Sequence, residues 1–255
     1  MFKPVFHTFK FELYIQRIKF IIFSLVSFIV AIISAFIYRA LPWPQYSLYQ
    51  SSLWWFVFTI LFSSSFFFSS IICSEYKKKT GLMIIPLITR QELFIGKFLA
   101  NYLYVVVFAA IHYITIYILA FSFYGPPLIS TPLISFAFVT LFILALCCLI
   151  SFFSSFMPSP AYVIIIIIAL YVFGFSMIES IIDSSIEPLY SFVYLYKIII
   201  EIINPNFSVF GRIFEDPDGT IYWSFPTVEG AIFSLSVYAI IFFSLTLFIF
   251  KKKQI

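Results

Sequence analysis

Six long runs of apolar residues dominate this sequence and limit what it can fold into. At about 1.5 Å of rise per residue, a helix over each run crosses a hydrocarbon core of ~30 Å. The runs lack the period-two alternation of barrel strands, so the sequence predicts an all-α integral membrane protein. The predicted spans cover residues 20–38, 52–74, 98–123, 133–157, 161–178 and 231–250.

The composition favours a single transmembrane domain over residues 1–255. Only 10% of the residues are charged, against about 25% in soluble domains, and no polar stretch is long enough for a separate soluble domain. The spacing of Cys73, Cys147 and Cys148 matches neither a disulfide framework nor a zinc site, which favours a packing role. The predicted parts are an interfacial helix (1–19), spans one to five (20–178), an outer region (179–230), and span six with a basic tail (231–255).

The basic residues predict the orientation. Six spans place both termini on one side, and 12 of the 15 Lys and Arg residues fall on that side. Because positively charged loops stay in the cytoplasm, we expect both termini to be cytoplasmic and the protein to be a multi-pass protein of the cell membrane. The twelve are Lys3, Lys10, Arg17, Lys19, Lys77, Lys78, Lys79, Arg90, Lys97, Lys251, Lys252 and Lys253.

The segment before the first span combines positive charge with apolar bulk. Lys3, His7, Lys10 and Arg17 recur at helical spacing and share one face, while phenylalanines occupy another. This pattern is typical of a helix that lies in the membrane interface with its basic face toward anionic lipid headgroups. The alternative is a charged leader that only sets the topology.

The outer region, residues 179–230, holds eight of the 11 acids. Within it, Leu189–Ile203 is mostly apolar but carries two charges, which favours a re-entrant or surface-lying helical hairpin over a span. Glu179, Asp183 and Glu187 have the spacing of an acid ladder on one helix. Such a ladder is either a solvated face or a site for a cation or substrate.

A polar segment, Glu75–Lys97, separates spans two and three. It opens with an acid and three lysines, continues with an apolar patch, Leu82–Ile85, and is interrupted by Pro86. Thr89 and Glu92 have the spacing of a capping box, so we expect a short helix to end near Pro86 and a new helix to start after the cap. A small helix held at the membrane surface between two spans is suited to being moved by a partner.

The interiors of the predicted spans contain few groups that carry chemistry. His112 is the ionisable residue well inside a span, and we interpret it first as a side chain hydrogen-bonded between helices. Serines gather in span two, where close helix packing is favoured over a polar path. If a substrate path does run through the chain, the candidate residues are Ser65, Ser69 and His112.

The chain lacks the motifs of a nucleotide site or a hydrolase. Gly96-Lys97 is followed by Phe98, so the phosphate-binding loop pattern is not met, and no zinc-protease or serine-hydrolase motif is present. We therefore expect no enzymatic activity, no cofactor or metal in this chain, and no nucleic-acid partner.

Taken together, these features resemble an ABC-2 type permease, the membrane subunit of a class of ATP-driven transporters. The similarity in layout covers the whole length, and the loop between spans two and three carries the local motif. Members show an acid, a basic turn with glycine, an apolar patch, a proline, a basic residue and a Gly-Lys pair entering span three. Here these are Glu75, Lys77–Lys79, Gly81, Leu82–Ile85, Pro86, Arg90 and Gly96-Lys97.

The resemblance implies a coupling helix that sits in a groove of a separate ATPase subunit, where ATP and Mg²⁺ bind. Two ATPase subunits and two permease chains, identical or different, would form an exporter with the substrate path between the permeases. The alternatives are a membrane scaffold or assembly factor without transport, and an intramembrane enzyme. The acidic outer region departs from the family pattern and leaves the cargo open. The implied coupling residues are Glu75, Gly81, Leu82, Ile84, Ile85, Pro86 and Arg90.

Overall fold

The structure, a computed structural model, describes residues 2–39, 44–73, 89–125, 130–182, 186–204, 207, 212–215 and 221–252. Within these ranges, six helical segments are long and apolar enough to cross a membrane, and each coincides with a predicted span. The prediction of a mainly α-helical chain with six helices long and apolar enough to span a membrane is confirmed. The segments are α1 (Phe2–Arg39), α2 (Gln45–Phe68), α5 (Arg90–Tyr124), α6 (Ser130–Ser154), α7 with its continuation to Glu179, and α10 (Val228–Lys252).

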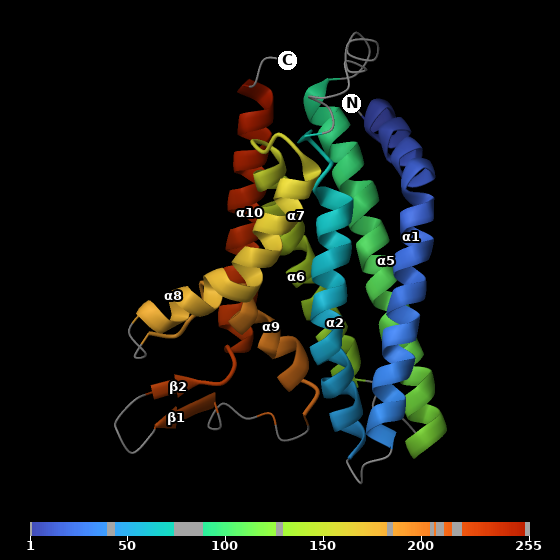
Figure 1. Cartoon of the computed structure of the whole chain (residues 1–255), viewed down its shortest axis with the longest axis vertical. Helices are drawn as coiled ribbons and strands as arrows, with labels where there is room; N and C mark the ends of the chain where they lie inside the picture. Colours follow the sequence, from blue (N-terminus) through green and yellow to red (C-terminus); the bar gives the residue numbers. More distant parts are fainter. Residues whose placement is uncertain are drawn as a thin grey trace.

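The six segments form a bundle with α2 and α6 at its centre (Figure 1). More than half of the most apolar stretch of α2 and of α6 is buried, whereas less than a quarter is buried in α1 and α10. Helix α1 packs along α5, and α10 packs along α6. Both chain termini lie at one end of the bundle, which we call the termini end; it also holds the start of α5 (Figure 1). The opposite end, where α1 ends and α2 begins, is the distal end.

Helix α1 is continuous, so the predicted interfacial segment (1–19) and span one are parts of a single helix. Its 38 residues give a length of about 57 Å, well beyond a ~30 Å hydrocarbon core. After Pro4 in the first turn, the segment contains no proline or glycine that would end a helix. The parallel helix α5 also supports it, because the two helices remain in contact from Thr8 to Phe36.

Span five is built from three pieces. Helix α7 (Pro160–Ala169) continues into a π-helical turn, η1 (Leu170–Gly174), and then into α8 (Phe175–Ile181). In Figure 1, α8 points away from the bundle at the level of α9. A π turn inserts an extra residue into a helix, so it shifts the register of the side chains that follow.

The predicted acid ladder is not formed. Helix α8 ends at Ile181, and the backbone of Ile182 is extended with ψ of 142°. Glu179 therefore lies on α8, while Glu187 lies beyond the helix in a turn that precedes the next one. Asp183, the middle member, lies outside the described residues. Because the helix stops between the two carboxylates, the i, i+4 spacing does not place them on one helical face.

In the described part of the outer region, the apolar segment forms a short, deeply buried helix, α9 (Phe192–Glu201), which does not fit the surface-lying alternative. It packs against α2, α6 and α10. Its backbone and side chains are anchored by two hydrogen bonds: the Ser135 hydroxyl donates to the Ile199 carbonyl at 2.6 Å, and the Tyr196 hydroxyl donates to the Leu53 carbonyl at 2.8 Å. Such internal partners are what non-spanning backbone needs inside an apolar bundle.

A small antiparallel sheet follows α9, a feature the sequence analysis did not anticipate. Strands β1 (Ile213–Glu215) and β2 (Ile221–Trp223) pair with Phe214 opposite Tyr222. They lie at the distal end, beside α8 (Figure 1). The chain then enters α10 and returns to the termini end.

Candidate functional site

The predicted coupling segment joins two points at the termini end. Helix α2 ends there, and α5 begins there (Figure 1). Arg90 is the first residue of α5 and is partly exposed. The other predicted coupling residues lie outside the described residues; they are Glu75, Gly81, Leu82, Ile84, Ile85 and Pro86.

The start of α5 is fixed by the capping box that the sequence predicted. The Thr89 hydroxyl accepts from the backbone N–H of Glu92 at 3.3 Å, and the Glu92 carboxylate accepts from the backbone N–H of Thr89 at 3.0 Å. Both amides would otherwise lack a partner within the helix. The cap therefore sets the residue at which the connecting segment becomes a rigid helix.

The other side of the segment is fixed by Ser154 of α6. Its hydroxyl donates to the Ser69 carbonyl at 2.9 Å and accepts from the N–H groups of Ile72 and Cys73, both at 3.3 Å. All four residues are buried. One side chain thus satisfies three backbone groups of the turn that follows α2, and it ties this turn to α6.

A glycine allows α1 and α5 to approach closely near the termini end. A Cβ atom at Gly96 would lie 2.8 Å from the Val5 carbonyl oxygen and 2.7 Å from the Thr8 Cβ. Distances this short do not occur at real Cβ atoms, so the backbones can meet here only because residue 96 has no side chain. The Gly-Lys pair noted in the sequence contributes its glycine to helix packing.

Next to this glycine, α1 and α5 share a buried polar cluster that the sequence analysis missed. The Glu12 carboxylate accepts from the Gln16 amide at 2.9 Å and from the Asn101 amide at 3.4 Å. All three side chains are buried. Glu12 and Gln16 could have been recognised as one face of a helix, but only the tertiary fold reveals that this face meets Asn101.

His112 lies at the junction of α1, α2 and α5. Its ring contacts the Ser27 hydroxyl at 3.3 Å through Nδ1 and the Ser52 hydroxyl at 3.2 Å through Nε2. It also stacks on Phe56, with ring centroids 3.8 Å apart. Both ring nitrogens are therefore occupied within the bundle, and this arrangement favours the interhelical hydrogen bond over a relay.

The candidate path residues are not gathered around one space. Ser65 is buried in the last turn of α2 and Ser69 is buried at the C-cap that follows it, toward the termini end, while His112 contacts Ser52 nearer the distal end. Ser69 bonds through its carbonyl to Ser154, and His112 to two other serines. A path through these residues remains a prediction.

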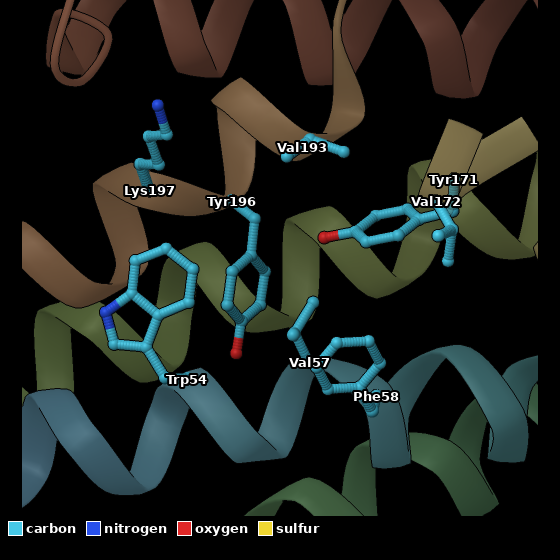
Figure 2. A pocket seen from close by; sticks show the side chains of 8 residues that line it. All are labelled: Trp54, Val57, Phe58, Tyr171, Val172, Val193, Tyr196 and Lys197. Atoms are coloured by element: carbon cyan, nitrogen blue, oxygen red, sulfur yellow. The ribbon is translucent and has the colours of Figure 1, made fainter. Parts of the chain in front are cut away.

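A pocket of about 190 Å³ lies between α2, η1 and α9 (Figure 2). Its walls are mostly apolar and aromatic, and Lys197 is the one charged side chain among the lining residues. None of the three candidate path residues contributes to it. The lining residues are Trp54, Val57, Phe58, Tyr171, Val172, Val193, Tyr196 and Lys197.

At the distal end, an ion pair fixes the start of β1 to the turn before α9. Arg212 Nη1 lies 2.8 Å from Glu187 Oε1, and both side chains are largely buried. The same carboxylate oxygen accepts from the Tyr194 hydroxyl at 3.2 Å, and the Arg212 guanidinium lies over the Trp223 ring. Burial, reinforced by the Glu187 charge, raises the pKa of Tyr194. Glu187 acts here as a structural partner and not as part of an acid ladder.

Within the described part of the chain, no group of three or more His, Cys, Asp or Glu side chains is placed to hold a metal ion. No protein-family model matches the sequence, and no curated protein matches it either.

Proposed function

We propose that this chain is the membrane-spanning permease subunit of an ATP-driven transporter of the ABC-2 type, acting as an exporter. Two copies of a separate ATPase would bind ATP and Mg²⁺, and a second permease chain, identical or different, would complete the substrate path. In this proposal, the termini end faces the cytoplasm, and the protein lies in the cell membrane.

The observation that supports the proposal most is the rigid support on both sides of the segment 74–88. On one side, the capped helix α5 runs unbroken for 35 residues and is held against α1 at Gly96. On the other side, Ser154 ties the turn after α2 to α6. A force applied to this segment by a motor subunit would reach three helices of the bundle as rigid-body motion.

The charge distribution supports the orientation. On the described part of the chain, the termini half of the bundle carries eight Lys and Arg residues, and the rest carries Arg39, Lys197 and Arg212. Positively charged segments are retained on the cytoplasmic side of membranes. The eight residues are Lys3, Lys10, Arg17, Lys19, Arg90, Lys97, Lys251 and Lys252.

Site-specific photo-crosslinking in native membranes tests the proposal. A photoreactive phenylalanine analogue replaces Ile85 in the full chain, and the matched control carries it at Ile186, an exposed residue at the distal end. We expect position 85 to capture an ATPase that contains a phosphate-binding loop, and position 186 not to. Equal capture at both positions, or no ATPase at position 85, would contradict the proposal.

A second measurement separates a transporter from a scaffold. The double variant Ile84→Asp and Ile85→Asp should insert normally but lose copurification with the captured ATPase, because the apolar anchor becomes charged. The wild-type pair in sealed vesicles should hydrolyse ATP faster than the ATPase alone. An ATPase that binds without any such stimulation would favour the scaffold.

A further inference from the structure

A cation, Lys197, lies at the edge of the pocket between α2, η1 and α9. It makes no ion pair within the described part of the chain, although Glu201, one helical turn further along α9, interacts with its charge; the Lys197 ammonium lies 5.5 Å from the centre of the Tyr194 ring. Figure 2 shows its side chain at one edge of the pocket, with the ammonium directed outward. A lysine at the side of an apolar bundle is stable only if it reaches headgroups or an anion.

The pocket also contains a hydroxyl group to which the described residues offer no hydrogen-bond partner. Tyr171 is 8% exposed, and its hydroxyl is directed into the pocket (Figure 2), where no described residue forms a hydrogen bond with it. Its neighbour Tyr196 is different, since that hydroxyl donates to the Leu53 carbonyl. Because this hydroxyl is directed into the pocket and has no acceptor among the described residues, it can donate to a ligand that supplies a hydrogen-bond acceptor.

The lining residues are ordered along the pocket. Lys197 and Trp54 lie at one edge, the Tyr171 hydroxyl lies in the middle, and Phe58 and Val172 lie at the other edge (Figure 2). Trp54 is 52% exposed on α2, as expected for an aromatic side chain at the level of lipid headgroups. Polarity therefore falls from a positively charged edge, through one hydrogen-bond donor, to an apolar edge.

We propose that this pocket binds an anionic, ester-linked phospholipid. The phosphate pairs with the Lys197 ammonium, an ester carbonyl accepts from the Tyr171 hydroxyl, and part of one acyl chain lies against Phe58 and Val172. A volume of about 190 Å³ holds only a segment of the lipid, so the remainder stays in the bilayer. The π turn carries both Tyr171 and Val172, which matches the frequent use of such turns at functional sites. This site does not depend on the proposed transport function.

Native mass spectrometry of the purified full chain provides the test. Three probes are added separately: phosphatidylglycerol, which is anionic with esters; phosphatidylcholine, which has esters but no net charge; and oleate, which is anionic without an ester. We expect one phosphatidylglycerol to bind about tenfold more tightly than one phosphatidylcholine, a difference typical of a charge-assisted contact.

Matched variants assign the two contacts. Lys197→Gln should remove the preference for phosphatidylglycerol over phosphatidylcholine, whereas Lys252→Gln, which removes a lysine with a similar ring contact at the termini end, should not. Tyr171→Phe should weaken the binding of both phospholipids about fivefold, as the loss of one hydrogen bond would, but leave the binding of oleate unchanged. Tyr162→Phe, at an exposed position of α7, is its control.

The apolar part of the site is tested by filling it. Val193→Trp should abolish binding of one tightly held phospholipid, and Val172→Phe serves as a second variant if the first does not fold. Equal effects of Lys197→Gln and Lys252→Gln would overturn the anion contact. Equal binding of oleate and phosphatidylglycerol, both insensitive to Tyr171→Phe, would overturn the ester contact and identify a free fatty acid as the ligand.

Discussion

The two ends of the bundle differ in how their helices are held together. Near the termini end, Gly96 of α5 lies close to the Val5 backbone and the Thr8 side chain of α1, and the Glu12 cluster and the Thr89 cap lie on either side of this contact. At the distal end, α8 leaves the bundle after a π turn, and a pocket opens where Tyr171 and Lys197 lie.

This difference indicates a division of roles within one bundle. Closely packed interiors transmit displacement because they resist compression, so a helix pair in tight contact moves as one body. A helix that diverges from its neighbours exposes lining side chains that a ligand can cover. We therefore expect substitutions near the termini end to alter rigidity, and substitutions at the distal end to alter binding and the anchoring of the outer region.

The largest effect is expected at the Arg212–Glu187 ion pair, which anchors the outer region. Arg212→Met leaves the Glu187 carboxylate largely buried without its cation, which should lower the free energy of unfolding by about 3 kcal/mol. Adding Glu187→Gln should restore part of this loss, because the uncompensated charge disappears. Arg39→Met is the matched control, since Arg39 lies over the Phe123 ring but is exposed. Thermal or denaturant unfolding in detergent compares these three variants with the wild type. A similar loss of unfolding free energy in Arg212→Met and Arg39→Met would refute the structural role of the pair.

The next effect concerns the close contact of α1 and α5. Gly96→Ala introduces a Cβ against the Val5 carbonyl and Thr8, so the helices must separate, at a cost of about 2 kcal/mol. Gly174→Ala is the control: the nearest atom to its added Cβ is Leu170 Cδ1, a flexible end of a side chain. There the higher helix propensity of alanine should leave stability unchanged or slightly increased. If both variants unfold at the same temperature as the wild type, the close contact of α1 and α5 at Gly96 does not contribute to stability.

A smaller effect is expected at Ser154, the brace between α6 and the turn after α2. Ser154→Ala leaves the buried N–H groups of Ile72 and Cys73 without their acceptor, which should cost about 1.5 kcal/mol. Ser122→Ala is the control, because the exposed Ser122 hydroxyl bonds only to a carbonyl of its own helix. Hydrogen exchange should accelerate at residues 72 and 73 in the first variant alone. Unchanged protection there would mean that Ser154 does not hold the turn.

How far the sequence predicts this structure depends on the range of each interaction. The six spans follow from hydropathy, a property of contiguous residues, and the Thr89 cap follows from two residues three apart. Both predictions are confirmed. The change of polarity near residue 19 does not end the helix, because α1 continues through it to Arg39.

The contacts that hold the candidate sites join residues far apart in the chain. Ser154 meets the turn at Cys73, and Arg212 meets Glu187, only after the bundle has formed. A single sequence gives hydroxyl and charge positions but not their partners. For the same reason, the apolar segment around α9 was correctly expected to be helical, but its burial between α2, α6 and α10 could not be predicted.

The smallest effect is expected at the N-cap of α5, where a substitution should disturb the first turn of the helix without disturbing its packing on α1. Thr89→Ala removes the acceptor for the Glu92 amide, and an N-cap lost from an exposed helix end costs about 1 kcal/mol. Because the contact at Gly96 lies two turns further on, the first turn of α5 should fray while the pairing with α1 persists. Hydrogen exchange should rise at residues 90–93 and stay unchanged at 97–101, and Thr89→Ser, which retains the hydroxyl, should restore protection. Loss of protection through residue 101 would show that the cap and the helix pair form one cooperative unit, which would make the start of α5 part of the rigid body and not a hinge before it.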